Sequence, residues 1–218
     1  MVPTPAPNSG RARPLPATER RAALIDAAVP LLSRRGTRVT TREIAEAAGV
    51  AEGTIFRVFR DKDELVQCAI AAVLDPSPAL TELDRVDPEL PLRERLVEIA
   101  TVLQQRLLRV FNIMIACELT GPPKREARDR ATAEHPAHGE ILARIGDLLL
   151  PDRETFDRPV YEVVRLLRLL TFAGSHPLIN DGELLSAEQI AGVLLDGVRG
   201  GHREVAGYLS YQRGDHSC

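Results

Sequence analysis

The chain has 218 residues, of which 44% are hydrophobic, 27% are charged and 4% are aromatic, and its formal net charge is -3. This length allows one or two domains with a sizeable core, and the hydrophobic content is ordinary for a globular protein. The three cysteines, Cys68, Cys117 and Cys218, are scattered along the chain without a CxxC pair, so the sequence suggests neither a disulfide framework nor a structural zinc site.

The negative net charge alone argues against a nucleic-acid binder, but the charge is unevenly distributed. Residues 1–67 carry 11 basic and 8 acidic side chains, whereas residues 68–218 carry 17 basic and 23 acidic ones. A basic N-terminal part on an acidic body is expected when only one part of a protein meets phosphate. The first 67 residues are therefore the candidate nucleic-acid-binding part.

No segment is typical of a membrane protein or of an exported one. The longest nearly apolar run, Val110 to Cys117, is far too short to span a bilayer. The first 16 residues are rich in proline and lack the apolar centre of a signal peptide. We expect a reduced, cytoplasmic protein.

The N-terminal residues 1–16 are expected to form a disordered arm, because proline-rich segments do not bury a core. Arg11 and Arg13 lie near its end, and they fit either an arm that reaches into the minor groove or a solvated tail.

A first helix is predicted from about Thr18 to Arg35. It is ended by Gly36 and has the buried stripe Leu24, Ala27, Ala28, Leu31 and Leu32. Pro30 lies within it and permits a kink.

Residues 40–62 predict two short helices joined by a tight turn. Thr40 is placed to cap the first of them, with Glu43 at the capping-box spacing. Gly49 breaks the helical spacing of the apolar residues, and a second run then places Ile55, Val58 and Phe59 on one face. This pattern is typical of a helix-turn-helix, whose second helix enters the major groove.

A further helix is predicted to begin at Asp61, with Glu64 completing a second capping box. Lys62 lies at its start, where backbone N–H groups already favour phosphate. The predicted buried face of this helix consists of Leu65, Ala69, Ala72 and Val73. The sequence Asp-Pro-Ser-Pro at 75–78 indicates that the helix breaks there, and a loop is expected to about Pro91.

The rest of the chain predicts a helical body. A long helix begins at Leu92, with apolar residues on two faces, and the pattern leaves open whether it breaks near Arg109 to Asn112. Further helices are predicted at 138–150, 159–175 and 186–199. The helix at 159–175 is apolar nearly all the way round, so we expect one face to pack on its own core and the other on a second chain. In the last predicted helix, at 186–199, Gly192 and Gly197 permit another helix to cross closely.

Residues 20–66 resemble the N-terminal domain of the TetR family of transcriptional regulators. Three blocks carry this resemblance in the family's order and spacing: IDAAVPLLSRRG, VTTREIAEAAGV and GTIFRVFRDKDEL. The resemblance implies an all-α fold with an N-terminal three-helix DNA-binding domain and a larger helical domain for ligand binding and dimerisation. The expected divisions are 1–16 for the arm, 17–66 for the DNA-binding domain, 67–200 for the helical domain and 201–218 for a tail.

The resemblance also implies which residues contact DNA: Thr40, Thr41, Arg42, Gly53, Thr54, Phe56, Arg57 and Lys62. Arg42 falls on a family position that can reach a base edge, although a phosphate contact or an ordinary surface charge fits it equally well. Two residues depart from the family pattern. Ala51 stands where the family commonly has a serine cap, and Phe56 stands where a tyrosine commonly supplies a hydroxyl to phosphate.

A ligand pocket in the body is a family expectation too, with Phe111, Met114, Cys117, Glu118, Arg168 and Phe172 as candidate lining residues. Each of these is also explained as ordinary core or surface. His135, His138 and Glu140 lie close in sequence but lack the helical spacing of a zinc hydrolase, and no phosphate loop or nucleophile elbow is present. We therefore expect no catalytic residue, no metal and no cofactor.

The sequence thus indicates a homodimeric TetR-like regulator that binds double-stranded operator DNA. We expect a repressor that is released from a palindromic operator by a small-molecule effector of unknown identity. The dimer is expected to form through the helices around 159–175 and 186–199. Two alternatives stay open: a helical ligand-binding or enzymatic protein with a degenerate DNA-binding head, and a non-specific DNA binder, which the acidic body disfavours.

Overall fold

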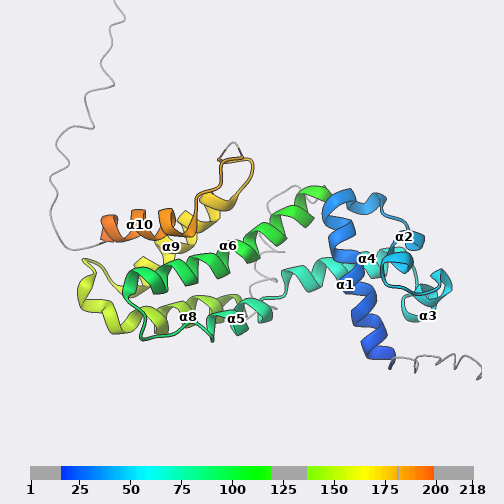
Figure 1. The fold of residues 1–218 in the computed structure, drawn as a ribbon, viewed down its shortest axis with the longest axis horizontal. Helices are drawn as coiled ribbons and strands as arrows, with labels where there is room; N and C mark the ends of the chain where they lie inside the picture. The colour runs from blue at the N-terminus through cyan, green and yellow to red at the C-terminus, as the bar shows by residue number, and fades with distance from the viewer. Residues whose placement is uncertain (1–15, 119–136, 181, 199–218) are drawn as a thin grey trace, which may run out of the picture. The chain divides into compact units, whose positions relative to one another are not determined.

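The computed structural model describes residues 16–118, 137–180 and 182–198, and all regular structure in these ranges is helical, as the sequence predicts (Figure 1). The predictions for the arm at 1–15, for His135 and for the tail at 201–218 lie outside the described residues. None of the helices in the described ranges combines the length and hydropathy needed to cross a bilayer.

The described residues form two compact units. The first is drawn from Met1–Pro78 and Gln105–Pro136, and the second from Ala79–Gln104 and Ala137–Cys218. The long helix α6 (Leu92–Ala116) contributes residues to both. It is continuous through Arg109 to Asn112, where the sequence left a break open. The domain boundaries expected from the sequence stay predictions.

The first unit contains α1 (Ala17–Arg35), α2 (Thr41–Ala47), α3 (Ile55–Val58) and α4 (Lys62–Leu74). These elements pack, with the end of α6, around one apolar core. Its buried members are Leu24, Ala28, Leu32, Val39, Ile44, Ala45, Ile55, Phe59, Leu65, Val66, Ala69, Ile70, Ile113 and Cys117. Of the stripe predicted for α1, Leu24, Ala28 and Leu32 are thus confirmed as buried, while Ala27 and Leu31 are half-buried.

The face of α4 that the sequence predicts is confirmed at three of its four residues. Leu65 and Ala69 are buried and Val73 is half-buried against the same core, whereas Ala72 is exposed. Val66 and Ile70 are buried as well, so the face is wider than the one predicted. The C-terminal end of α4 is closed by Arg106 of α6, which donates to the carbonyl oxygens of Leu74 (2.8 Å) and Asp75 (2.7 Å).

The expected loop between Asp75 and Pro91 was wrong in part, because residues Ser77–Leu83 form helix α5. The Asp75 carboxylate accepts hydrogen bonds from the N–H (3.0 Å) and the hydroxyl (2.8 Å) of Ser77, which supports the start of the helix. Proline is compatible with the first turn of a helix, so Pro78 does not interrupt it. Ala79 and Leu83, one helical turn apart, are buried.

The second unit also contains α8 (Ala137–Leu149), a short 3-10 segment (Leu150–Thr155), α9 (Val160–Ser175) and α10 (Ala187–Val198). These helices lie close to the ranges predicted for them. Ser186 and Gln189 cap α10 reciprocally, because the Ser186 hydroxyl accepts the Gln189 N–H (3.2 Å) and the Gln189 side chain accepts the Ser186 N–H (2.7 Å). Arg95, which is buried, pairs with Asp152 and so ties α6 to the 3-10 segment.

Candidate nucleic-acid interface

The N-terminus of α2 is fixed by the capping box that the sequence predicts. The Thr40 hydroxyl accepts a hydrogen bond from the N–H of Glu43 (3.3 Å), and the Glu43 carboxylate accepts one from the N–H of Thr40 (2.8 Å). Two of the N–H groups that a helix start leaves unpaired are thereby satisfied. The capping box fixes where α2 begins, so Thr41 and Arg42 lie in its first turn.

The turn after α2 depends on Gly49, whose φ of 66° is a conformation that other residues adopt at a cost. The N–H of Gly49 donates to the carbonyl of Glu46 (3.1 Å), and the N–H of Val50 donates to the carbonyl of Ala45 (2.9 Å). These bonds close the end of α2 and redirect the chain. Ala51 then offers no side-chain cap to the next helix.

The second helix of the motif is short. Gly53 and Thr54 lie in a 3-10 turn, Glu52–Thr54, and the α-helical part, α3, spans only Ile55–Val58. The side chain of Thr41 donates to that of Glu52 (2.5 Å), which links the start of α2 to this turn. Without a cap, the first turn tightens into 3-10 geometry. Ile55 and Phe59 are fully buried and anchor the segment.

The predicted DNA-contacting residues all lie in the first unit, mostly at its surface. Thr40, Arg42, Gly53, Phe56 and Arg57 are exposed, and Thr41, Thr54 and Lys62 are half-buried. Within the described residues, neither Arg42 nor Arg57 has an ion pair or hydrogen-bond partner.

Two of these residues have a particular setting. The Phe56 ring is 54% exposed, which is unusual for a large aromatic side chain. Lys62 is less available than expected from the sequence, because its ammonium group donates to the carbonyl of Thr37 (2.7 Å).

Asp61 caps α4 as predicted, but Glu64 does not close the box on it. The Asp61 carboxylate accepts the N–H of Glu64 (2.8 Å), whereas the Glu64 carboxylate accepts the N–H of Arg60 (2.8 Å), one residue earlier. The backbone N–H of Glu64 lowers the pKa of Asp61, and that of Arg60 lowers the pKa of Glu64. Both carboxylates are therefore held in the charged form, which the positive end of the α4 dipole favours.

The six predicted ligand residues are divided between the two units. Phe111, Met114 and Cys117 lie in the first unit, and the last two pack in or against the helix-turn-helix core. Burial raises the pKa of the Cys117 thiol. Glu118 is exposed just beyond the end of α6. Arg168 and Phe172 lie on the exposed side of α9 in the second unit. Neither unit by itself brings all six together.

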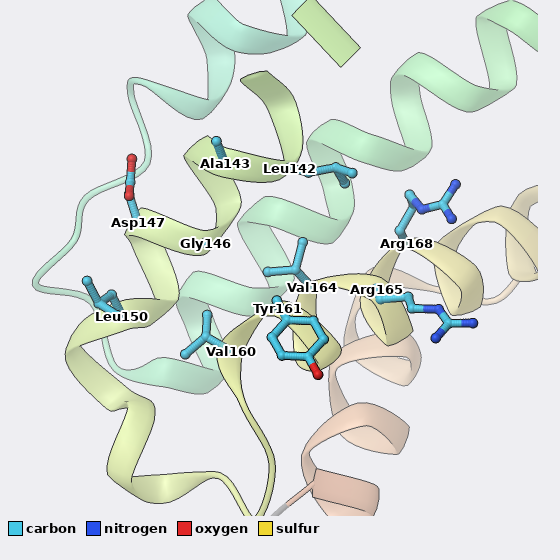
Figure 2. Close-up of a pocket in the computed structure, with 10 residues that line it drawn as sticks. All are labelled: Leu142, Ala143, Gly146, Asp147, Leu150, Val160, Tyr161, Val164, Arg165 and Arg168. Carbon is cyan, nitrogen blue, oxygen red and sulfur yellow. The ribbon is translucent and has the colours of Figure 1, made fainter. Parts of the chain in front are cut away.

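A groove of about 610 Å³ lies in the second unit between α8 and α9 (Figure 2). Of the six predicted ligand residues, only Arg168 lines it. The groove is lined by Leu142, Ala143, Gly146, Asp147, Leu150, Val160, Tyr161, Val164, Arg165 and Arg168. Most of these residues cannot be recognised from the sequence, because half-exposed apolar residues on two amphipathic helices are indistinguishable from ordinary packing positions. Within the described residues, no group of three or more His, Cys, Asp or Glu side chains could hold a metal ion.

Together, an all-helical fold and a capped two-helix motif with an exposed Arg42, Phe56 and Arg57 define a helix-turn-helix protein. Residues 24–69 match the model of the tetR family of bacterial regulatory proteins. The chain therefore carries the N-terminal domain of the tetR family, as the sequence resemblance indicated.

Comparison with individual proteins agrees with this assignment. The chain is 33% identical over 139 residues to the transcriptional regulator TtgR of Pseudomonas putida, covering 60% of this chain and 66% of that protein. It is 38% identical over 77 residues to the transcriptional repressor KstR2 of Rhodococcus jostii, covering 34% and 35%. The matches thus span less than two thirds of these relatives. A solved tetR-family regulator from Streptomyces coelicolor shares the fold, with a TM-score of 0.57, 20% identity, and coverage of 84% of this chain and 80% of that one.

Proposed function

We propose that this protein is a DNA-binding transcriptional regulator that acts as a repressor in the cytoplasm. The observation that carries the proposal is the exposed face of the helix-turn-helix, where Arg42 and Arg57 have no partner within the described residues and Phe56 is exposed. Unpaired guanidinium groups can donate hydrogen bonds to phosphates and base edges, and an exposed aromatic ring can contact a thymine methyl group. The two relatives named above are transcriptional regulators, which supports the same conclusion.

The two arginines are proposed to have different tasks. Arg42 lies in the first turn of α2 and is assigned to a base edge, where an arginine pairs with guanine through two hydrogen bonds. Arg57 lies on the exposed side of α3 and is assigned to the phosphate backbone or a base. Phe56 cannot supply a hydroxyl to phosphate, so it is assigned an apolar contact with a thymine methyl or a sugar.

Replacing Arg42 and Arg57 tests the proposal directly. Duplexes are first selected from a randomised pool by the purified protein, and affinities of Arg42→Ala and Arg57→Ala are then measured at several salt concentrations. If the arginine reads a base, its replacement is expected to lower the affinity for the selected duplex by about 10-fold to 100-fold and to relax the sequence specificity at one base position. If the arginine binds a phosphate, its replacement is expected to lower the affinity for all duplexes alike and to reduce the slope of log affinity against log salt concentration by about 1.

Arg85→Ala is the control, since Arg85 is an exposed arginine of the second unit, paired with Glu82. It should bind DNA as the unaltered protein does. If the unaltered protein selects no duplex over random competitor, the proposal is wrong. The alternative, a helical ligand-binding or enzymatic protein with a degenerate head, would then be favoured by the uncapped Ala51 and by the missing hydroxyl at Phe56.

The regulator is proposed to act as a homodimer through α9 and α10. Large apolar side chains are exposed on both helices, with Tyr161, Leu169 and Phe172 on α9 and Val193 on α10. An added Cβ at Gly197 would meet no atom within 4 Å, so another helix has room to approach there. A four-helix interface, with two helices from each chain, would let two heads meet half-sites about 34–36 Å apart on a near-palindromic operator.

The groove between α8 and α9 is proposed as the effector site. Its volume of about 610 Å³ lies within the range of small-molecule sites. Its lining is mostly apolar, with Arg165 and Arg168 at the α9 side. Within the described residues neither arginine has an ion-pair partner. An apolar molecule with an anionic group fits this lining, and its binding is proposed to release the operator through a coupling between the two sites.

Filling the groove should abolish such binding. Gly146 lines the groove, and an added Cβ there meets nothing within 4 Å, so the backbone accepts a side chain at this position and Gly146→Leu places its apolar atoms in the groove. We expect the variant to lose the fluorescence enhancement of anilinonaphthalene sulfonate, an apolar anion, while its stability is kept or raised, because glycine within a helix costs about 0.5–1 kcal/mol relative to alanine. Gly139→Leu, on the same helix but outside the groove, is the matched control. Equal dye binding by both variants would exclude the groove.

A further inference from the structure

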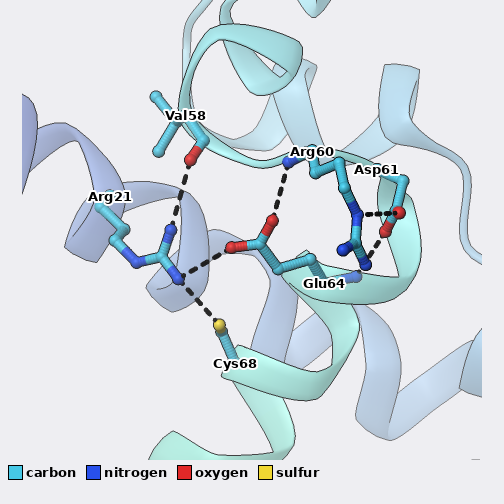
Figure 3. A network of polar contacts seen from close by, with 6 residues as sticks. All are labelled: Arg21, Val58, Arg60, Asp61, Glu64 and Cys68. Atoms are coloured by element: carbon cyan, nitrogen blue, oxygen red, sulfur yellow. Dashed lines mark hydrogen bonds and ion pairs between the residues drawn. The ribbon is translucent and has the colours of Figure 1, made fainter.

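Arg21 of α1 stands at the centre of a polar network that joins three helices (Figure 3). Its guanidinium donates to the carbonyl oxygen of Val58 (3.3 Å), to the Glu64 carboxylate (3.3 Å) and to the sulfur of Cys68 (3.0 Å). It also lies over the buried ring of Phe59, 4.3 Å from the ring centroid. One side chain of α1 therefore contacts the last residue of α3, the residue after it, and two turns of α4.

The same network fixes the short connection between α3 and α4. Glu64 accepts from Arg21 through one carboxylate oxygen and from the backbone N–H of Arg60 through the other. Arg60 in turn pairs with Asp61, the cap of α4 (2.8 Å). The chain from Val58 to Asp61 is thus held by hydrogen bonds at nearly every residue. None of these groups is among the predicted DNA contacts.

Helix α3 needs such external support. It has only four residues, begins in a 3-10 turn and has no side-chain cap, so it cannot be stable by its own backbone bonds. Burial of Ile55 and Phe59 holds it in the core, but apolar burial is not directional and leaves its rotation loosely fixed. The Val58 carbonyl is one of the groups that a helix end leaves unpaired. Because a hydrogen bond is directional, a planar guanidinium that binds this carbonyl fixes the rotation of α3.

We propose that Arg21 is a positioning residue for DNA reading, which orients α3 by holding the Val58 carbonyl and the Glu64 carboxylate while stacking on Phe59. This inference rests on the proposed DNA-binding function. Arginine is required because its rigid fork reaches several acceptors at once, whereas lysine offers a single point charge. Arg21 acts through α3 and touches no base.

The test compares Arg21→Gln, Arg21→Lys and the control Arg34→Gln, which removes an equal charge from an exposed position on the same helix. Affinities are measured for a duplex selected from a random pool by the unaltered protein and for a scrambled duplex of equal length. We expect Arg21→Gln to bind the selected duplex about 10-fold more weakly and the scrambled duplex within about twofold, because a misoriented helix loses base contacts but keeps the charge-driven term. Arg21→Lys should be intermediate, and Arg34→Gln unchanged.

A second measurement does not need DNA. Amide hydrogen exchange in the free protein should be about 10-fold faster at residues 55–60 of Arg21→Gln, with α2 unchanged, since local opening is expected where the support is removed. An equal loss of affinity on both duplexes would mean a phosphate contact or general destabilisation and would overturn the inference. Unchanged exchange at 55–60 would also overturn it. If the unaltered protein prefers no duplex, the proposed function fails, and the exchange result alone decides whether Arg21 positions α3.

Discussion

Replacing Gly36 by alanine is expected to destabilise the N-terminal unit by about 3 kcal/mol or more. Gly36 ends α1 with φ 59° and ψ -150°, a conformation that is almost exclusive to glycine. It is also buried against the end of α6, where an added Cβ would overlap the carbonyl oxygen of Ala116 and lie 2.9 Å from its carbonyl carbon. Both obstacles are backbone, so neither can be relieved by a rotamer change.

Gly49→Ala separates the two contributions. Gly49 has a similar φ of 66°, but an added Cβ there meets no atom within 4 Å. It should therefore cost only the conformational strain, about 1–2 kcal/mol. Urea unfolding of the full chain, followed by circular dichroism, gives both values. If the two substitutions cost the same, the close approach of Gly36 to α6 contributes nothing to the fold, and the packing of α6 against this turn must be different.

Local signals in the sequence predicted the DNA-binding part best. Thr40 with Glu43, Gly36, Gly49 and Asp61 each act within a few residues of the chain, so their spacing alone indicates a cap or a turn. The role of Gly36 shows the limit of such reasoning. The sequence explains why the helix ends there, but the approach of Ala116, eighty residues later, follows only from the tertiary fold.

Features that depend on distant contacts were missed or displaced. Arg21 reads as a solvated charge at the edge of an apolar stripe, and its partners on α3 and α4 lie 37 to 47 residues away. Ser77 and Pro78 read as breakers, although an aspartate before them starts α5. Four of the six predicted ligand residues, Phe111, Met114, Cys117 and Phe172, are apolar positions on or next to long helices, and such positions are shared by core and cavity. Glu118 and Arg168 are charged positions beside them. Their role in binding stays a prediction.

Introducing a charge at Val193 is expected to separate the proposed dimer. Val193 is 57% exposed on α10, so Val193→Glu should change the stability of the isolated chain by less than about 0.5 kcal/mol. In a helix pair, the same carboxylate would be buried without a partner, which costs several kcal/mol. In the proposed arrangement each head alone meets one half-site, so loss of the dimer should weaken binding to a two-half-site operator by about 100-fold or more.

Light scattering and gel shifts on the selected duplex measure the two effects together. Ile115→Glu is the control, because Ile115 is also a large exposed apolar residue but lies on the part of α6 that belongs to the first unit, whereas α9 and α10 belong to the second. It should leave both the dimer and the DNA affinity unchanged. A dimeric Val193→Glu would exclude this face of α10 from the interface. A monomer that still binds the full operator with unaltered affinity would mean that the two heads act independently, and the exposed apolar face of α9 and α10 would then need another partner.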